Sequence, residues 1–287
     1  MKRILNIFSS QFESDAECRG VLADHGFISA TLLNDGNGDT RWIKLDITMI
    51  SPDPLLSQMS CKEPKLFTRE ELAYERRELD DALLLDLSID SAEDDIITNN
   101  GVGWDVQNAC PGCLSGARAV SRVDLNSKKL PNRGDARNDF RAILFHERVV
   151  AAIEDVVGNR LDFQPSRDAR TREPCAWHIV SPRTILPRLH PSTRGVVDES
   201  RPPRCAMCDR SGHVHTVKVA FEPRIGSADI TGPMPRIAST WECFGIGNRG
   251  ANKFCPPIPM LVVSQAVRQA LLRLKVSRLR WTPITIV

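Results

Sequence analysis

The most informative segment of the chain is residues 143–166, ILFHERVVAAIEDVVGNRLDFQPS. It aligns without a gap with residues 261–284, LVVSQAVRQALLRLKVSRLRWTPI, and the two copies have identical residues at Val149/Val267 and Pro165/Pro283, among other positions. Each copy has the pattern of a buried strand, a short amphipathic helix and a second strand that is closed by the proline. Chance similarity between two amphipathic segments is the alternative explanation.

A Cys-x-x-Cys pair precedes each copy, Cys110/Cys113 the first and Cys205/Cys208 the second. This shared order favours a duplicated module, with an insertion in the second half. The sequence therefore predicts an α+β fold in which two similar strand-helix-strand modules are joined by a four-cysteine zinc knuckle pair. We expect a small β-rich region with an acidic helix over residues 1–100, the first CxxC module over 101–170 and the second over 171–287.

The first hundred residues contain a hairpin pattern. Two β-compatible runs, Phe27–Leu33 and Trp42–Ile47, are separated by the turn-forming sequence NDGNG. Farther on, residues 68–71 fit a capping box, and leucines at 72, 79 and 83 form an apolar stripe, so we expect a helix from Thr68. This helix leads into an acidic stretch that ends at Asp95. The stretch is interpreted as a solvated face or, alternatively, as a surface for a basic partner protein.

Composition sets limits on the class of protein. The chain has 287 residues, of which 41% are apolar and 26% charged, the balance of an ordinary globular protein. The formal net charge of +2 provides no global field that would draw the chain to nucleic acid or anionic lipid. No apolar run is long enough for a signal peptide or a membrane span, so we expect a cytoplasmic protein without a membrane partner.

The nine cysteines argue against a disulfide framework, because their number is odd and no export signal accompanies them. Four of them, Cys110, Cys113, Cys205 and Cys208, form two CxxC turns that together offer the four thiolates of a structural Zn²⁺ site. Redox chemistry is the less favoured reading, because neither pair opens an amphipathic helix. Reduced structural thiols or separate sites remain open. The remaining candidates for a metal are His213, His215, Cys243 and Cys255.

Further features give the chain a likeness to a known family. These are Trp104 ahead of the first CxxC, Pro202-Pro203-Arg204 leading into the second, and Trp281-Thr282-Pro283 closing the second copy. From about Trp104 onward the chain resembles the double-CxxCG motif proteins of myxobacteria, some of which are immunity proteins for Sit-type toxins. Members carry glycine directly after the second cysteine, where this chain has Leu114 and Asp209, with Gly116 and Gly212 a few residues later.

The resemblance implies a non-enzymatic protein that binds and neutralises a cognate protein toxin. In agreement, the chain has no Walker-type phosphate loop, no G-x-S-x-G elbow and no H-E-x-x-H. The alternative is a nucleic-acid-binding zinc ribbon, which the arginine-rich and lysine-free stretch Arg160–Arg210 favours. Aromatic residues for base stacking are few in that stretch, essentially Phe163 and Trp177, and structural ion pairs or toxin contacts explain its arginines better. A third reading, an enzyme, has no residues to nominate.

Overall fold

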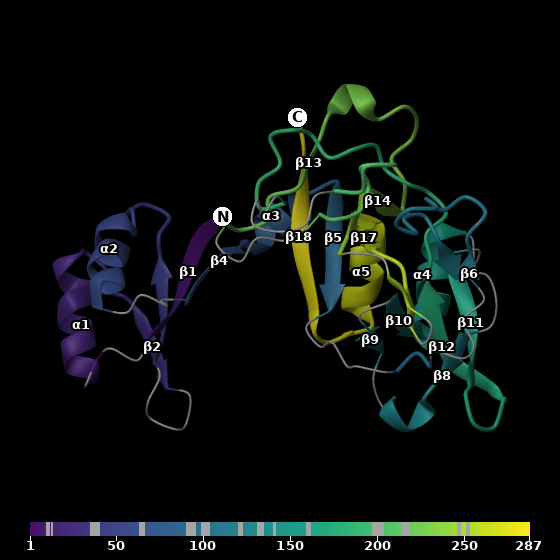
Figure 1. Cartoon of the computed structure of the whole chain (residues 1–287), viewed down its shortest axis with the longest axis horizontal. Helices are drawn as coiled ribbons and strands as arrows, with labels where there is room; N and C mark the ends of the chain where they lie inside the picture. The colour runs from purple at the N-terminus through teal and green to yellow at the C-terminus, as the bar shows by residue number, and fades with distance from the viewer. Residues whose placement is uncertain are drawn as a thin grey trace. The chain divides into compact units, whose positions relative to one another are not determined.

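The computed structural model shows a mixed α/β protein with several sheets and few helices (Figure 1). It describes residues 1–9, 12, 14–34, 41–62, 67–89, 96–98, 104–119, 123–130, 135–139, 142–158, 162–196, 204–213, 219–245, 248–250 and 253–287. The chain divides into two compact units. The first consists of Met1–Glu78 with two short later segments, and the second contains the rest of the chain.

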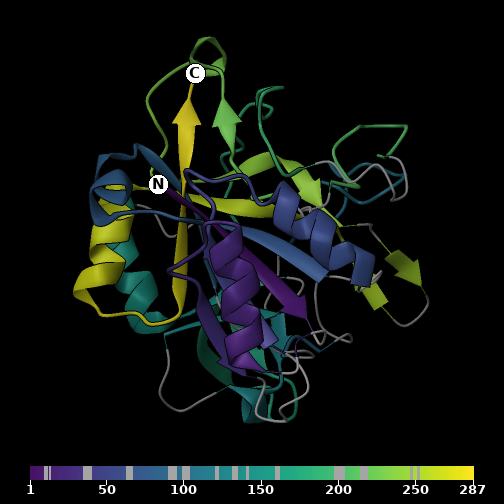
Figure 2. The ribbon, with the colours of Figure 1, turned by 90° about the vertical axis from the view of Figure 1, so that its left-hand side faces the viewer.

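The first unit has the element order β-α-β-β-α-β. Its elements are β1 (Lys2–Ser9), α1 (Asp15–Asp24), β2 (Thr31–Asn34), β3 (Arg41–Asp46), α2 (Asp53–Lys62) and β4 (Phe67–Ala73). The sheet order is β2-β3-β1-β4 and every neighbouring pair is antiparallel, which is the split β-α-β or ferredoxin-like topology. Both helices cover one face of this sheet (Figure 2). They bury Cys18, Leu22, Leu55 and Met59 against the strands, so both described helices of this unit lie on the same face.

One prediction for this unit is confirmed and another is wrong. The expected hairpin is present as β2 and β3, which pair antiparallel with Leu33 opposite Trp42. The NDGNG turn falls largely outside the described residues. The helix predicted from Thr68 is instead strand β4, whose pairing with β1 satisfies the backbone from Phe67 to Ala73. A short helix, α3 (Arg76–Asp81), follows. Long-range pairing has outweighed the local capping pattern.

The first sheet of the second unit surrounds the first copy of the repeat. It is built from β8 (Val123–Leu125), β9 (Ala136–Asp139), β10 (Ala142–His146), β11 (Phe163–Asp168) and β12 (Pro174–Val180), and α4 (Glu147–Val157) connects β10 to β11. The strand order is β8-β11-β12-β10-β9. All neighbouring strands are antiparallel except β8 and β11, which are parallel.

The second sheet surrounds the second copy. It is built from β5 (Leu84–Ile89), β13 (Arg224–Ile225), β14 (Ile237–Phe244), β17 (Ile258–Ser264) and β18 (Leu279–Ile286), and α5 (Gln265–Arg273) connects β17 to β18. The strand order is β13-β18-β5-β17-β14, and here too only the first pair is parallel. Small elements complete the unit: β6 (Trp104–Asp105), β7 (Arg118–Ala119), β15 (Asn248–Gly250), β16 (Lys253–Cys255) and the 3-10 turns η1 (Ser127–Lys129) and η2 (Ser227–Asp229).

The strand-helix-strand pattern read from both copies is present in the structure. The helices begin at Glu147 and Gln265, which are matching positions of the alignment. The valines Val149 and Val267 are both fully buried, and the two helices pack against each other within one core that both sheets share. Ser264 stands at the N-cap of α5 as expected, although its side chain makes no capping hydrogen bond.

The sheets do not follow the predicted segment boundaries. Strand β5 comes from the first hundred residues, yet it lies between β17 and β18 in the centre of the second sheet. Strand β12 comes from the expected second module, yet it lies between β10 and β11 in the first sheet. Burial explains this: Leu84, Leu85 and Leu87 of β5 are all buried, on both faces, as expected of a central strand.

Candidate metal centre

Two short turns bring the four CxxC cysteines together within the second unit. The first turn lies between β6 and β7, which pair antiparallel and hold its ends together. The second lies in the long connection between β12 and β13, and three backbone hydrogen bonds fasten it to the end of β14 and the residue that follows it. In these, the amide of Cys243 donates to the carbonyl of Arg210, that of Gly212 to Gly245, and that of Gly245 to His213.

The two turns have the same backbone design. In the first, the amide of Leu114 donates to the carbonyl of Cys110 at 2.8 Å, and in the second the amide of Asp209 donates to that of Cys205 at 2.8 Å. Leu114 and Asp209 both adopt left-handed backbone angles, with φ of 65° and 57°. The turn that glycine forms most easily is therefore made by a leucine and an aspartate, at a conformational cost of about 1 kcal/mol each.

The left-handed residue directs the next amide at a sulfur. The amide of Ser115 bonds to Sγ of Cys113, and the amide of Arg210 bonds to Sγ of Cys208. Such amide-to-sulfur hydrogen bonds stabilise thiolate charge. The departure from a CxxCG pattern at these positions thus leaves the amide-to-sulfur geometry intact.

Gly112 allows the two turns to approach closely. A side-chain carbon at this position would lie 2.7 Å from Sδ of Met207 and 3.4 Å from Sγ of Cys205. Both atoms belong to the second turn. The glycine of CPGC therefore lets the second turn pack closely against the first, and a larger residue would have to displace the exposed side chain of Met207.

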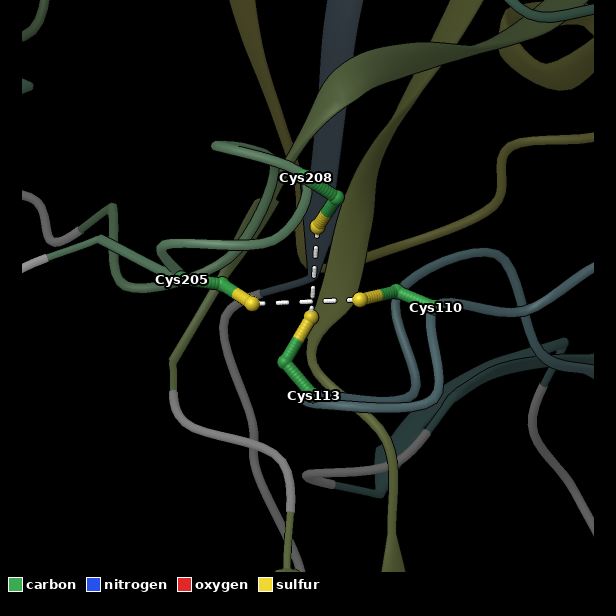
Figure 3. A group of neighbouring side chains, drawn as sticks. All are labelled: Cys110, Cys113, Cys205 and Cys208. Carbon is green, nitrogen blue, oxygen red and sulfur yellow. Dashed lines mark hydrogen bonds between the residues drawn. The ribbon is translucent and has the colours of Figure 1, made fainter.

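The four sulfur atoms converge on one point, and all lie within 4.8 Å of one another (Figure 3). The sulfur of Cys110 is 3.8 Å from that of Cys205, and the sulfur of Cys113 is 3.4 Å from that of Cys208. A tetrahedral ion with metal-sulfur bonds of about 2.3 Å places its sulfurs about 3.8 Å apart. The four cysteines predicted as ligands are thus brought together, and they could hold a metal ion.

The thiols are not equivalent electrostatically. Burial raises the pKa of Cys113, but hydrogen bonds from Ser115 and Ser211 outweigh it and lower that pKa to about 6. Burial, together with the neighbouring sulfurs of Cys113 and Cys110, raises the pKa of Cys208 to about 12. Negative charge on one sulfur therefore opposes ionisation of the next. A cation at the centre removes this opposition, because each thiolate then faces positive charge.

Two serines beside Cys113 were not among the residues predicted for this site. Ser115 and Ser211 are both buried, 1% and 3% exposed, and both hydroxyl groups reach the sulfur of Cys113. A signal was present, because a Ser-Gly pair follows each CxxC, as CLSG and as CDRSG.

The two other candidate ligands that the structure describes, His213 and Cys243, do not join the four-sulfur group. Nε2 of His213 lies 3.1 Å from the carbonyl oxygen of Asp209, and its ring packs on Phe244. Cys243 is buried beside Ser115, and burial raises the pKa of its thiol. His215 and the side chain of Cys255 lie outside the described part of the structure.

A small cavity of about 100 Å³ adjoins the first turn. Its walls come from β10, β12, β14 and β17, from the residues after Cys113, and from Arg118, Arg210 and Cys243. The described residues that line it include no carboxylate and no imidazole. The cavity therefore has the character of an apolar pocket with two cations, and it lacks the acid and base groups that proton transfer requires.

Half of the ten arginines in the arginine-rich stretch Arg160–Arg210 form ion pairs in the described structure. Five arginines pair with three acidic residues: Arg167 and Arg172 with Asp124, Arg188 and Arg204 with Asp209, and Arg194 with Glu222. Arg188 also lies over the ring of Trp241, 4.0 Å from its centroid. These arginines have structural roles, which weighs against the stretch as a continuous phosphate-binding surface.

Among the described residues, no helix is both long enough and apolar enough to span a membrane. Comparison of the chain with protein families, with curated proteins and with solved structures finds no match in any of the three.

Proposed function

We propose that the four cysteines form a structural zinc site. The observation that carries this proposal is the convergence of four sulfur atoms from two turns 95 residues apart, with spacings that suit a tetrahedral ion. Zinc is the metal that such a closed set of thiolates selects most often in proteins. Four protein ligands leave no position for water or substrate, which supports a non-enzymatic role for the ion.

The ion would clamp the β6-β7 hairpin to the segment that is bonded to β14. This closes a long loop, and structural zinc contributes on the order of 10 kcal/mol to the folding of small domains. Cys113, Ser115 and Ser211 would form the most buried part of the centre, where the hydroxyl groups stabilise the thiolate charge.

We also propose that the two five-stranded sheets are copies of one module. Strand by strand, β8-β11-β12-β10-β9 corresponds to β13-β18-β5-β17-β14, with the same parallel and antiparallel pairs. The two differ in where the central strand comes from, since β12 follows β11 whereas β5 precedes every other strand of its sheet. The correspondence supports a duplication in which this strand has changed place.

For the whole protein we propose a binding role, that of an immunity protein that neutralises a toxin from a neighbouring cell. The support is the resemblance to the double-CxxCG proteins, together with left-handed turns at Leu114 and Asp209 where that pattern has glycine. The apolar cavity beside the first turn, flanked by Arg118 and Arg210, offers a place for an apolar side chain of an acidic partner.

Metal analysis of variants tests the zinc site. Purified wild-type protein should contain one zinc ion per chain, and Cys110→Ser or Cys205→Ser should lose both the zinc and thermal stability. Cys175→Ser is the matched control, because Cys175 is a free cysteine of the same unit outside the four-sulfur group. If a serine variant fails to fold, Co²⁺ substitution of the wild type still tests the site, because cobalt held by four thiolates in a tetrahedron has characteristic absorption bands. Unchanged zinc content in both variants, or octahedral cobalt, overturns the assignment.

Co-purification tests the immunity role. The protein should form a stable complex with the toxin encoded beside its gene, and its expression should protect cells that produce this toxin. Arg118→Glu and Arg210→Glu should weaken the complex if the cavity receives the partner. Absence of both complex and protection contradicts the proposed role and leaves the zinc assignment untouched.

A further inference from the structure

The sheet of the first unit carries an aromatic row on the face opposite helices α1 and α2. Alternate side chains of a strand share a face, so Phe8 of β1 lies on the side opposite the buried Leu5 and Ile7. The register places Phe8 directly across from Trp42 of β3 on one side and from Phe67 of β4 on the other. The three rings therefore span three adjacent strands in one line.

The rings contact one another and remain open to solvent. Phe8 meets Trp42 edge to face, with centroids 3.6 Å apart, and meets Phe67 in the same manner at 5.0 Å. Trp42 is 43% exposed and Phe67 is 46% exposed. Leu33, opposite Trp42 on β2, continues the row to the edge of the sheet and is 55% exposed. Exposed apolar groups gathered in this way mark a binding surface.

The next row along the same face is polar and basic. Asn6 lies between Lys44 and Arg69 in the register, and both of these side chains are exposed. Arg69 also pairs with Glu71 at 3.3 Å, an exposed ion pair that a competing anion can replace. The row with Asn6 lies two residues along β1 from the row with Phe8, so about 7 Å separates the cations from the rings. This distance matches the separation of a base from its phosphate.

We propose that this face binds single-stranded nucleic acid, with bases stacked on Trp42, Phe8 and Phe67 and with phosphates at Lys44 and Arg69. Aromatic faces accept any unpaired base by stacking, whereas the bases of a duplex are already stacked on each other. A four-stranded sheet with aromatic side chains on its central strands is a general solution for holding unpaired bases, and the strand order β2-β3-β1-β4 provides that arrangement. The inference goes beyond the proposed toxin-binding role and uses none of the four cysteines.

This sheet face is distinct from the arginine-rich stretch Arg160–Arg210, on which the sequence-based alternative of nucleic-acid binding rests. That stretch has many cations but few aromatic residues, and five of its ten arginines are engaged in ion pairs. The sheet face has few cations and a continuous set of rings. Binding here is therefore expected to depend on stacking more than on charge, with little preference for base sequence.

Fluorescence anisotropy with the full-length protein tests the proposal. The probes are labelled single-stranded ten-nucleotide oligomers of uridine and of thymidine, with a duplex of the same length for comparison, at low salt. The single strands should bind and the duplex should bind much more weakly. Trp42→Ala and Phe67→Ala should each raise the dissociation constant roughly 5- to 150-fold, the range for loss of one stacked base.

Met49→Ala is the matched control, because Met49 is 91% exposed in the same unit and lies beyond the end of β3, outside the row. This variant should bind as the wild type does. Lys44→Gln and Arg69→Gln should each reduce the slope of binding against salt by about 0.7, the value for one phosphate contact on a single strand. Removal of zinc should leave binding unchanged if the first unit stays folded, which circular dichroism checks.

Two results overturn the inference. The first is absence of single-strand binding at low salt by the folded wild-type protein. The second is binding that Trp42→Ala and Phe67→Ala leave unchanged, because the oligomer then lies elsewhere. If these variants lose a protein partner while oligonucleotide binding is absent, the row is a protein-docking surface and the proposal is wrong.

Discussion

Asp86 on β5 gives a quantitative test of how tightly the second sheet is packed. Its neighbour on the same face, Leu84, belongs to an apolar cluster with Val262 and Ile284, and Asp86 itself is 9% exposed. Burial raises the pKa of this carboxyl group to about 7, from the value of 3.8 that an exposed aspartate has. The folded protein therefore holds this proton more tightly than the unfolded chain does.

The consequence for stability follows from linkage. The contribution of Asp86 is fully present below pH 4, and it is lost as the pH rises from there through 7. One pKa unit corresponds to 1.36 kcal/mol, so the shift amounts to roughly 4 kcal/mol above pH 7, of which roughly 2.5 kcal/mol develops between pH 5 and pH 8. Asp86→Asn removes the ionisation while it keeps the size of the side chain. It should therefore stabilise the protein more at pH 8 than at pH 5, by about this difference.

Guanidinium unfolding of the wild type and of the variant at both pH values, in the same buffer, measures the effect. Asp155→Asn is the control, since Asp155 is an exposed carboxylate on α4 and its replacement should change stability little at either pH. A stability gain that is the same at pH 5 and pH 8, or a variant less stable than wild type at pH 8, would refute the reasoning that Asp86 is desolvated.

Three further predictions concern other parts of the fold, and urea unfolding checks each of them. Lys275, just after α5, has a left-handed φ of 55°, which glycine adopts without strain, so Lys275→Gly should stabilise the protein by about 0.5 to 1 kcal/mol. The reverse change after α4, Gly158→Lys at a φ of 73°, should destabilise it by a similar amount. Asp124 is 2% exposed between Arg167 and Arg172, which lower its pKa despite its burial; Asp124→Asn should cost roughly 2 kcal/mol at neutral pH, and the loss should shrink as acid protonates the wild-type carboxylate. Gly195→Ala should destabilise the protein by more than about 1 kcal/mol, because φ is 77° and the new carbon would lie 2.7 Å from the carbonyl oxygen of Ala220. Gly20→Ala should not destabilise the protein, because the added carbon has no atom within 4 Å.

The parts of the fold that the sequence predicts are those in which local pattern and tertiary structure agree. In α4 and α5 the buried residues recur at helical spacing, as Val149, Val150 and Ile153 do, and buried strands flank each helix. Helices α1 and α2 gave no such signal, because each buries mainly one pair of residues four apart, Cys18 with Leu22 and Leu55 with Met59. Two apolar positions on one turn are too few to define a period.

Pairing between distant strands could not be predicted, because no local pattern encodes it. The run Phe67–Ala73 has helix-like capping and leucine spacing, but its pairing with β1 decides its conformation. Leu84–Ile89 is a short apolar run in an acidic stretch, and only its neighbours β17 and β18 make it a central strand. The candidate metal ligands were more predictable than their surroundings, since CxxC spacing specifies the four thiols but not the serine hydroxyl groups behind them.

The place of β5 at the centre of the second sheet affects how the protein is made. About 170 residues separate this strand from β17, its nearer neighbour in the chain. At 5 to 20 residues per second, a ribosome needs roughly 10 to 30 s to deliver that partner. During this interval Leu84–Ile89 has neither of its neighbouring strands to pair with, so the nascent chain carries an unpaired apolar strand of the kind that promotes aggregation.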